Sequence, residues 1–190
     1  MASVTTNDVR VGMKVEVDKE PYLIIINEFV KPGKGQAFNR IKMKNMINGR
    51  VVEKTYKSGE KLDLADIEER QMRFVYKEAD GAVFMDEKTF DQVEISNELI
   101  GNNQQWLMEE TVFQVVFYKG VVIEITPPTF MEMFVTETSP GVRGDTSGRV
   151  LKPATTETGA KIQIPIFVEE GEKIKVDTRT CEYVSRASEK

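Results

Sequence analysis

The stretch VKPGKGQAF contains one lysine whose neighbours leave its amine accessible to other molecules. Lys34 lies between Gly33 and Gly35, with Pro32 before them. Glycines allow a tight turn and give the lysine no neighbouring side chain to pack on, so its amine is expected to point into solvent. An exposed amine is a hydrated point charge that can contact phosphate or accept a covalent modification. The stretch therefore predicts a displayed amine at the tip of a turn.

Other reactive groups are scarce. The chain has no histidine and a single cysteine, Cys181. Ser-His and Cys-His nucleophile pairs, His-containing zinc sites and an internal disulfide are therefore excluded. The 31 Asp and Glu residues single out no acid-base pair, and we interpret them as solvating groups. We expect no metal and no cofactor, and a hydrolase is disfavoured.

Charge is unevenly distributed along the chain, whose net charge is -5. Residues 1–64 carry 12 basic and 8 acidic side chains, residues 65–128 carry 5 and 13, and residues 129–190 carry 9 and 10. Residues 31–50 hold no acidic side chain and six basic ones: Lys31, Lys34, Arg40, Lys42, Lys44 and Arg50. Such a run is typical of a phosphate-binding surface, although a solvated basic face has the same composition.

The apolar pattern has a period of two over most of the chain. PYLIIINEFV reads as a strand entering the lysine turn, and AFNRIKMKNMI reads as one leaving it. Alternation in the second run places Arg40, Lys42 and Lys44 on one face, and Ile41 and Met43 on the other. The turn is therefore predicted to be the tip of a hairpin whose outer face is basic.

Further short runs, RQMRFVY, TVFQVVFY, GVVIEIT, KIQIPIFV and KIKVDTR, alternate with turn signals and predict an all-β protein of small barrels or sandwiches. One helical stretch is expected over residues 96–108, with Ser96 as its N-cap. Its apolar residues Leu99, Trp106 and Leu107 are expected in the core.

Breaks near Leu64 and at Pro127-Pro128 divide the chain into three predicted modules: residues 1–64, 65–128 and 129–190. The two prolines predict a stiff joint and hence an elongated array. No segment approaches the ~20 apolar residues of a membrane span, and the first residues lack the apolar core of a signal peptide. We expect a cytoplasmic monomer with no membrane partner.

Several motifs together resemble one family. EFVKPGKGQAF, RVVEKTYKSGEK, GDTSG, KPATTETGAKIQIPIFVEEG and KVDTRTCEYVSR occur in this order over essentially the whole chain. In combination they resemble bacterial translation elongation factor P. The resemblance implies an N-terminal SH3-like (KOW-like) barrel followed by two OB-type barrels.

The resemblance also implies a function. The factor would bind the 70S ribosome between the peptidyl-tRNA and exit sites and promote peptide-bond formation at consecutive prolines. It would not be an enzyme, since it would perform no bond chemistry of its own. Lys34 would approach the 3′ end of the peptidyl-tRNA and would carry a covalent addition, β-lysylation, made by a modifying enzyme. The residues implied to bind tRNA are Lys31, Pro32, Gly33, Lys34, Gly35, Gln36, Arg40, Lys42 and Lys44. Those implied to bind messenger or ribosomal RNA are Gly144, Asp145, Thr146, Ser147, Gly148, Tyr183 and Arg186.

Three alternatives stay open. An elongation factor P-like paralogue would share the architecture and differ mainly at the lysine loop. An OB-type single-stranded RNA binder would need stacking platforms, and the sequence clusters no aromatics on a strand face. An unrecognised enzyme would have to work without histidine. The sequence does not identify a partner for the acidic middle module; one hypothesis is that it faces basic ribosomal protein rather than RNA.

Overall fold

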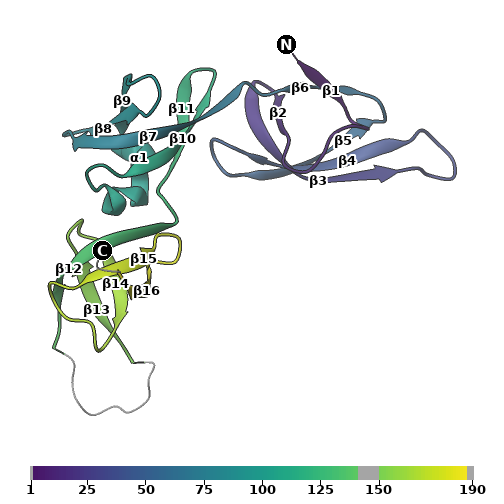
Figure 1. The fold of residues 1–190 in the computed structure, drawn as a ribbon. Coiled ribbons are helices and arrows are strands. Elements are labelled where there is room, and N and C mark those ends of the chain that lie inside the picture. The colour runs from purple at the N-terminus through teal and green to yellow at the C-terminus, as the bar shows by residue number, and fades with distance from the viewer. Residues whose placement is uncertain (1, 141–149, 188–190) are drawn as a thin grey trace. The chain divides into compact units, whose positions relative to one another are not determined.

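The computed structural model describes residues 2–140 and 150–187, in which three sheets follow one another along the chain (Figure 1). Internal contacts group the chain into two units. The first comprises Met1–Arg70 and Val115–Glu124, and the second comprises Gln71–Gln114 and Ile125–Lys190. No helix among the described residues is long and apolar enough to cross a membrane.

The first sheet has six strands in the order β1-β6-β2-β3-β4-β5. Its strands are β1 (Ser3–Thr5), β2 (Lys14–Val17), β3 (Glu20–Val30), β4 (Phe38–Asn45), β5 (Val51–Lys57) and β6 (Lys61–Leu64). Strands β3 and β4 form the predicted hairpin, with Val30 opposite Phe38 at its closed end. Figure 1 shows the two strands side by side.

The core of this sheet follows from the alternation in its sequence. Ile41 and Met43 are fully buried, whereas Arg40, Lys42 and Lys44 between and beside them are exposed. The buried side chains join Val15, Ile24 and others in one apolar cluster. Burial on one face fixes the register, because a slip of one residue would turn every basic side chain into the core.

The second sheet has five strands in the order β11-β10-β7-β8-β9. They are β7 (Ile67–Lys77), β8 (Gly81–Asp86), β9 (Gln92–Ser96), β10 (Val112–Tyr118) and β11 (Val121–Thr126). Phe84 packs edge-on against both Phe74 and Phe113, with ring centroids 5.7 and 5.4 Å apart. At Gly81 a Cβ would collide with the backbone of Ile95, so only glycine fits this strand pairing.

The predicted helix is shorter than its sequence pattern. It consists of α1 (Asn97–Ile100), capped by the Ser96 hydroxyl accepting from Leu99 N, and the 3₁₀ helix η1 (Gly101–Trp106). Gly101 has a φ of +52°, which ends the α-helical turn. Trp106 and Leu107 are buried as expected, but Leu99 is only half-buried and Ile100 takes the core position.

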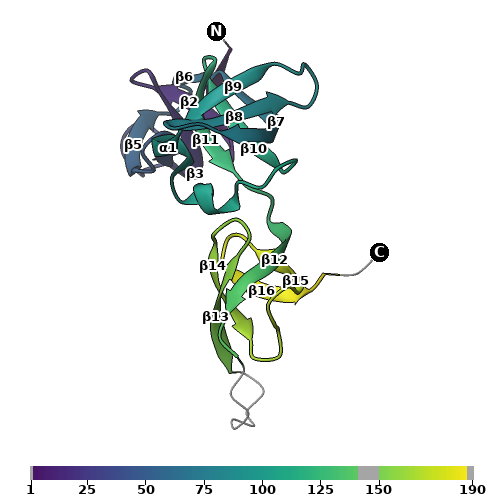
Figure 2. The same ribbon diagram turned by 90° about the vertical axis from the view of Figure 1, so that its left-hand side faces the viewer.

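The third sheet closes into a barrel with the order β12-β13-β14-β16-β15 (Figure 2). Its strands are β12 (Phe130–Thr138), β13 (Leu151–Thr156), β14 (Lys161–Pro165), β15 (Lys173–Asp177) and β16 (Glu182–Arg186). All pairs are antiparallel except β14 with β16. Inward side chains such as Met133, Ile164 and Ile174 are fully buried. The expectation of a mainly β protein is thus confirmed, and strand pairing closes the barrel in this third sheet.

Candidate nucleic-acid interface

Lys34 lies at the tip of the β3–β4 hairpin, in the loop 31–37, and is exposed. Within the described residues its amine has no hydrogen-bond or ion-pair partner. The base of the loop is fixed, because Ser58 N donates to Ala37 O at 3.1 Å. The tip is therefore a short loop that displays a free amine from an anchored base.

The two flanking glycines differ in role. Gly35 has a φ of +119°, a backbone conformation that favours glycine, and its Cβ position lies 3.6 Å from Pro32 Cγ. Gly33 does not have a positive φ, and a Cβ there would meet nothing within 4 Å. We expected both glycines to adopt a positive φ in the turn, and only Gly35 does so. Around them, Lys31 and Gln36 are exposed and Pro32 is half-buried.

Arg40, Lys42 and Lys44 project from the outer face of β4, as predicted, but their surroundings are not purely basic. Pairing with β3 and β5 brings Glu28 and Glu53 beside Arg40, with N–O distances of 3.8 and 3.6 Å. The run 31–50 has no carboxylate of its own, so only the strand register reveals these neighbours. Lys42 and Lys44 have no ion-pair partner within the described ranges.

Exposure decides how strongly the two carboxylates hold Arg40. Its side chain is 47% exposed, and those of Glu28 and Glu53 are more exposed still. Exposed ion pairs at such distances contribute little stability. Arg40 can therefore exchange its carboxylates for a phosphate, at a smaller gain in affinity than an unpaired cation would give.

Tyr183 and Arg186, both on β16, meet at a third side chain that the sequence did not single out. Phe167 lies edge-on to Tyr183 at a centroid distance of 6.2 Å, and the Arg186 guanidinium lies 5.2 Å from the Phe167 ring centroid. Arg186 Nε also donates to Glu172 Oε2 at 2.9 Å. Phe167 follows the end of β14 and is 55% exposed. Its one signal in the sequence is that it is apolar at a position of the run KIQIPIFV that alternation assigns to the outer face.

This aromatic-cation cluster, Phe167, Tyr183 and Arg186, can stack on a base and contact phosphate. Its charge is already compensated by Glu172. The cluster is consequently better suited to contacts with RNA bases and sugars than to attracting phosphate over a distance.

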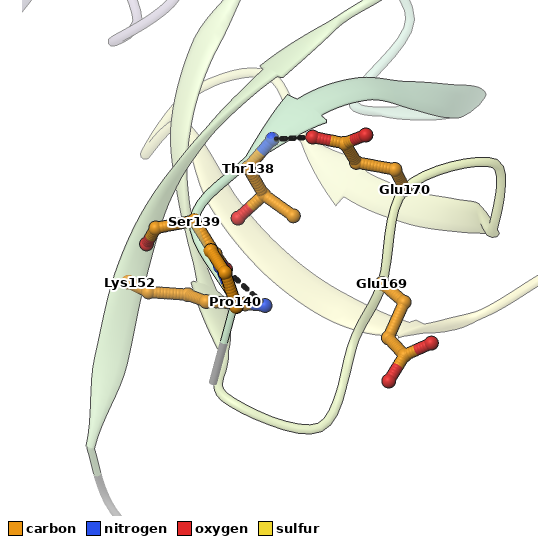
Figure 3. Close-up of a pocket in the computed structure, with 6 residues that line it drawn as sticks. All are labelled: Thr138, Ser139, Pro140, Lys152, Glu169 and Glu170. Atoms are coloured by element: carbon orange, nitrogen blue, oxygen red, sulfur yellow. Dashed lines mark hydrogen bonds between the residues drawn. The ribbon is translucent and has the colours of Figure 1, made fainter. Parts of the chain in front are cut away.

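The predicted loop from Gly144 to Gly148 lies outside the described residues. The structure describes the strands on either side of this loop. There, Lys152 on β13 is 7% exposed and donates from Nζ to Ser139 O at 2.8 Å (Figure 3). On the same side, Thr138 N donates to Glu170 Oε1 at 2.9 Å. These residues line a hollow of about 480 Å³. Sequence reasoning missed Lys152, because nothing local distinguishes a buried lysine from an exposed one.

Residues that ligate metals are not gathered anywhere in the described chain: no group of three or more Cys, Asp and Glu side chains is placed to hold an ion. The functional candidates are instead an exposed amine, a partly compensated basic stripe and an aromatic-cation cluster. This set, spread over small β-domains, combines the side-chain types that contact nucleic acids: exposed cations for phosphate and aromatic rings for bases.

Family models identify the three sheets in order. Residues 5–62 match the elongation factor P KOW-like domain, residues 67–125 match the elongation factor P OB domain, and residues 131–186 match the elongation factor P C-terminal domain. The chain belongs to the elongation factor P family and is a translation elongation factor.

Full-length relatives agree. The chain is 66% identical over 189 residues to Elongation factor P 2 of Protochlamydia amoebophila, covering 99% of this chain and 100% of the relative. It is 59% identical over the same length to Elongation factor P 2 of Chlamydia caviae, with the same coverage. The paralogue and the general RNA-binding alternatives are therefore not favoured.

Solved structures show the likeness of fold at low identity. Translation initiation factor 5A from Methanococcus jannaschii superposes with a TM-score of 0.56 at 22% identity, covering 66% of this chain and 92% of that one. A protein of the same initiation-factor family from Naegleria fowleri gives 0.54 at 14% identity, covering 66% and 97%.

Proposed function

We propose that this chain binds the 70S ribosome between the peptidyl-tRNA and exit sites and promotes peptide-bond formation at consecutive prolines. The observation that carries the proposal is the Lys34 amine, which lies at an anchored hairpin tip and has no hydrogen-bond or ion-pair partner among residues 2–140 and 150–187. An amine in this position can reach a target beyond the body of the protein. The expected setting is the cytoplasm, with the chain acting as a monomer.

Positioning is the mechanism that these residues support. Proline's ring restricts both the attacking amine and the nascent chain, so productive alignment of the reactants is rare. Holding two reactants in the reacting geometry can remove several kcal/mol from a barrier. The protein itself would break and form no bond, since ribosomal RNA supplies the catalytic centre.

The proposed contacts divide by chemistry. Arg40, Lys42 and Lys44 would bind the backbone of the tRNA acceptor stem without reading its sequence. The aromatic-cation cluster, together with residues 144–148, would contact messenger and ribosomal RNA.

We also propose that Lys34 is extended in the cell. Fixing a bare lysine side chain costs up to ~2 kcal/mol of rotamer entropy, which disfavours precise positioning by the amine alone. A β-lysyl group joined to Nζ through an amide would lengthen the side chain and carry two amines, spreading the ordering cost over more contacts. Peptide mass spectrometry of protein from its native host tests this: an unmodified Lys34 in fully active material would contradict it.

The function is tested by adding the chain to a purified translation system that lacks any elongation factor P. The expected result is faster synthesis from a template encoding consecutive prolines and an unchanged rate from a matched template encoding alanines. Equal effects on both templates, or none on either, would contradict the proposal.

A further inference from the structure

A hollow of about 350 Å³ lies on the core-facing side of the same hairpin, lined by Asn7, Asn27, Phe29, Asn39 and Ser58. Phe29 and Asn39 are cross-strand partners and therefore project from the same face. The volume falls within the range of small-molecule sites in proteins. None of the five lining side chains is charged.

The orientation of the Asn39 amide follows from its neighbours. Asn27 Nδ2 donates to Thr6 O at 3.1 Å and to Val9 O at 2.9 Å, which uses both of its hydrogens. Asn27 Oδ1 must then accept, and it does so from Asn39 Nδ2 at 3.0 Å. This arrangement leaves Asn39 Oδ1 as an acceptor.

Asn39 Oδ1 is buried without a donor. The residue is 2% exposed, and this oxygen has no hydrogen-bond partner among the described residues. Nearly all buried polar groups in proteins are paired, so an unpaired acceptor lining a hollow indicates a place for a donor from outside the chain. Phe29 borders the same hollow and is 57% exposed.

We propose that this hollow binds one unstacked nucleobase that carries an exocyclic amine, such as adenine or cytosine. The base would stack on Phe29 and donate from its amine to Asn39 Oδ1. A flat apolar ring with a protruding donor fits an aromatic face beside a buried acceptor. Because Asn39 Oδ1 has essentially no accessible surface, neighbouring side chains have to shift before the amine can reach it.

A second edge contact is available. Asn7 Oδ1 accepts from Ser58 Oγ at 2.8 Å. The Asn7 amino group can therefore donate to a ring nitrogen or carbonyl of the base. The proposal rests on the function proposed above, since Lys34 at the tip of this hairpin would bring the single-stranded end of a tRNA to it.

The test uses two nucleotides that differ only in the amine: adenosine 5′-monophosphate and purine riboside 5′-monophosphate. Each is titrated into the full, isotopically labelled chain while NMR signals of the Asn27 and Asn39 amides and the Phe29 ring are followed. We expect saturable shifts confined to the hollow and about tenfold weaker binding of the nucleotide without the amine.

Two variants assign the contacts. Asn39→Leu should bring the ratio of the two affinities to about one, because it removes the acceptor at similar volume. Phe29→Ala, an exposed change that does not threaten folding, should weaken both nucleotides about tenfold and preserve their ratio. Phe134→Ala, at an exposed phenylalanine of the third sheet, is the matched control and should change neither.

Equal affinities in the unaltered chain, or no localised shift with either nucleotide, would overturn the proposal. Binding is measured without ribosomes, so it separates from the proposed function. If the chain prefers the nucleotide with the amine but does not rescue proline stalling, the binding hollow stands and the proposed function is wrong. If the chain rescues stalling but shows no such preference, the proposed function stands and the hollow is not a base-binding site.

Discussion

On the hairpin, the lysines lack carboxylate partners among the described residues and only Arg40 has them, whereas on the C-terminal barrel both described arginines and one lysine are paired. On the barrel, Arg179 pairs with Asp177 at 2.7 Å, Arg186 with Glu172 at 2.9 Å and Lys173 with Glu132 at 3.4 Å. On the hairpin, within the part of the chain that the structure describes, four lysines have no such partner: Lys31, Lys34, Lys42 and Lys44. Counting the basic residues of a region therefore does not tell how many of its cations are free to bind a phosphate, because carboxylates already pair with some of them.

The largest expected effect comes from removing the amine at the tip. Lys34→Ala should slow diproline bond formation by about 10- to 100-fold, because a misplaced reactant loses most of the benefit of alignment. Its melting temperature should barely move, since exposed substitutions usually shift stability by less than ~0.5 kcal/mol. The matched control is Lys61→Ala, at an exposed lysine of the same sheet. A normal rate in Lys34→Ala would defeat the role given to this loop.

Replacing Arg40, Lys42 and Lys44 together with glutamine should weaken ribosome affinity by about 10- to 100-fold. Each lost phosphate contact lowers the slope of log affinity against log salt by ~0.7 to 0.9. The decrease in the salt slope should correspond to about two lost phosphate contacts rather than three, because Glu28 and Glu53 already compensate the charge of Arg40 in part. Co-sedimentation with ribosomes at several salt concentrations measures the slope; an unchanged slope would show that the stripe is only a solvated face.

The two tip glycines give a smaller, paired effect. Gly35→Ala forces a residue with a Cβ to a φ of +119°, which costs about 1–3 kcal/mol locally and should displace the tip. Gly33→Ala meets open space and no such strain. We expect Gly35→Ala to slow diproline translation several-fold and Gly33→Ala to leave it unchanged. Similar losses in both would mean that the tip tolerates no side chain at either glycine, and that φ is not the cause.

On the barrel, Glu172→Gln removes the charge that compensates Arg186 and keeps the amide oxygen as an acceptor. Ribosome affinity should rise about two- to fivefold at low salt, and the salt slope should steepen by ~0.7 as Arg186 gains a phosphate. The pair is exposed, so folding should be little affected. Weaker binding of Glu172→Gln would show instead that the ion pair orients Arg186 for its contact.

The smallest effect concerns acid stability. The Arg179 side chain, hydrogen-bonded to Asp177, holds the pKa of that carboxyl at about 2, below its usual 3.8. Because the folded value lies below the unfolded one, the pair stabilises the barrel fully above about pH 4 and loses this contribution as pH falls toward 2. The gap in melting temperature between the unaltered chain and Asp177→Asn should shrink over that interval.

Amide signals of the C-terminal barrel report this melting directly. Glu132→Gln, at an exposed carboxylate of the same barrel, should show no comparable change of its gap with pH. A gap for Asp177→Asn that stays constant from pH 4 to pH 2 would remove the ion pair from the account of stability.

Local patterns sufficed to predict the hairpin. Period-two alternation separates Lys42 from Met43, and two glycines mark the turn, so both strands and the tip follow from neighbouring residues. The helix was overestimated because its apolar spacing continues past Gly101, where the backbone leaves the α conformation.

Contacts distant in the sequence could not be predicted in this way. Glu28 and Glu53 reach Arg40 only through strand register, and Phe167 meets Tyr183 only when the barrel closes. Asn39 occupies a position on β4 that alternation assigns to the core, and the acceptor of its amide N–H, Asn27 Oδ1, comes from β3. Periodicity gives the face on which a residue lies; it does not give the neighbours that other strands supply.

The most direct test of the central claim is to see where the hairpin tip lies. A cryo-electron microscopy reconstruction of the chain on a ribosome stalled at consecutive prolines would show it. We predict that the Lys34 side chain, bare or extended, contacts the 3′ end of the peptidyl-tRNA, with Lys42 and Lys44 along its acceptor stem. A tip that points away from that tRNA end while stalling is relieved would contradict positioning by Lys34.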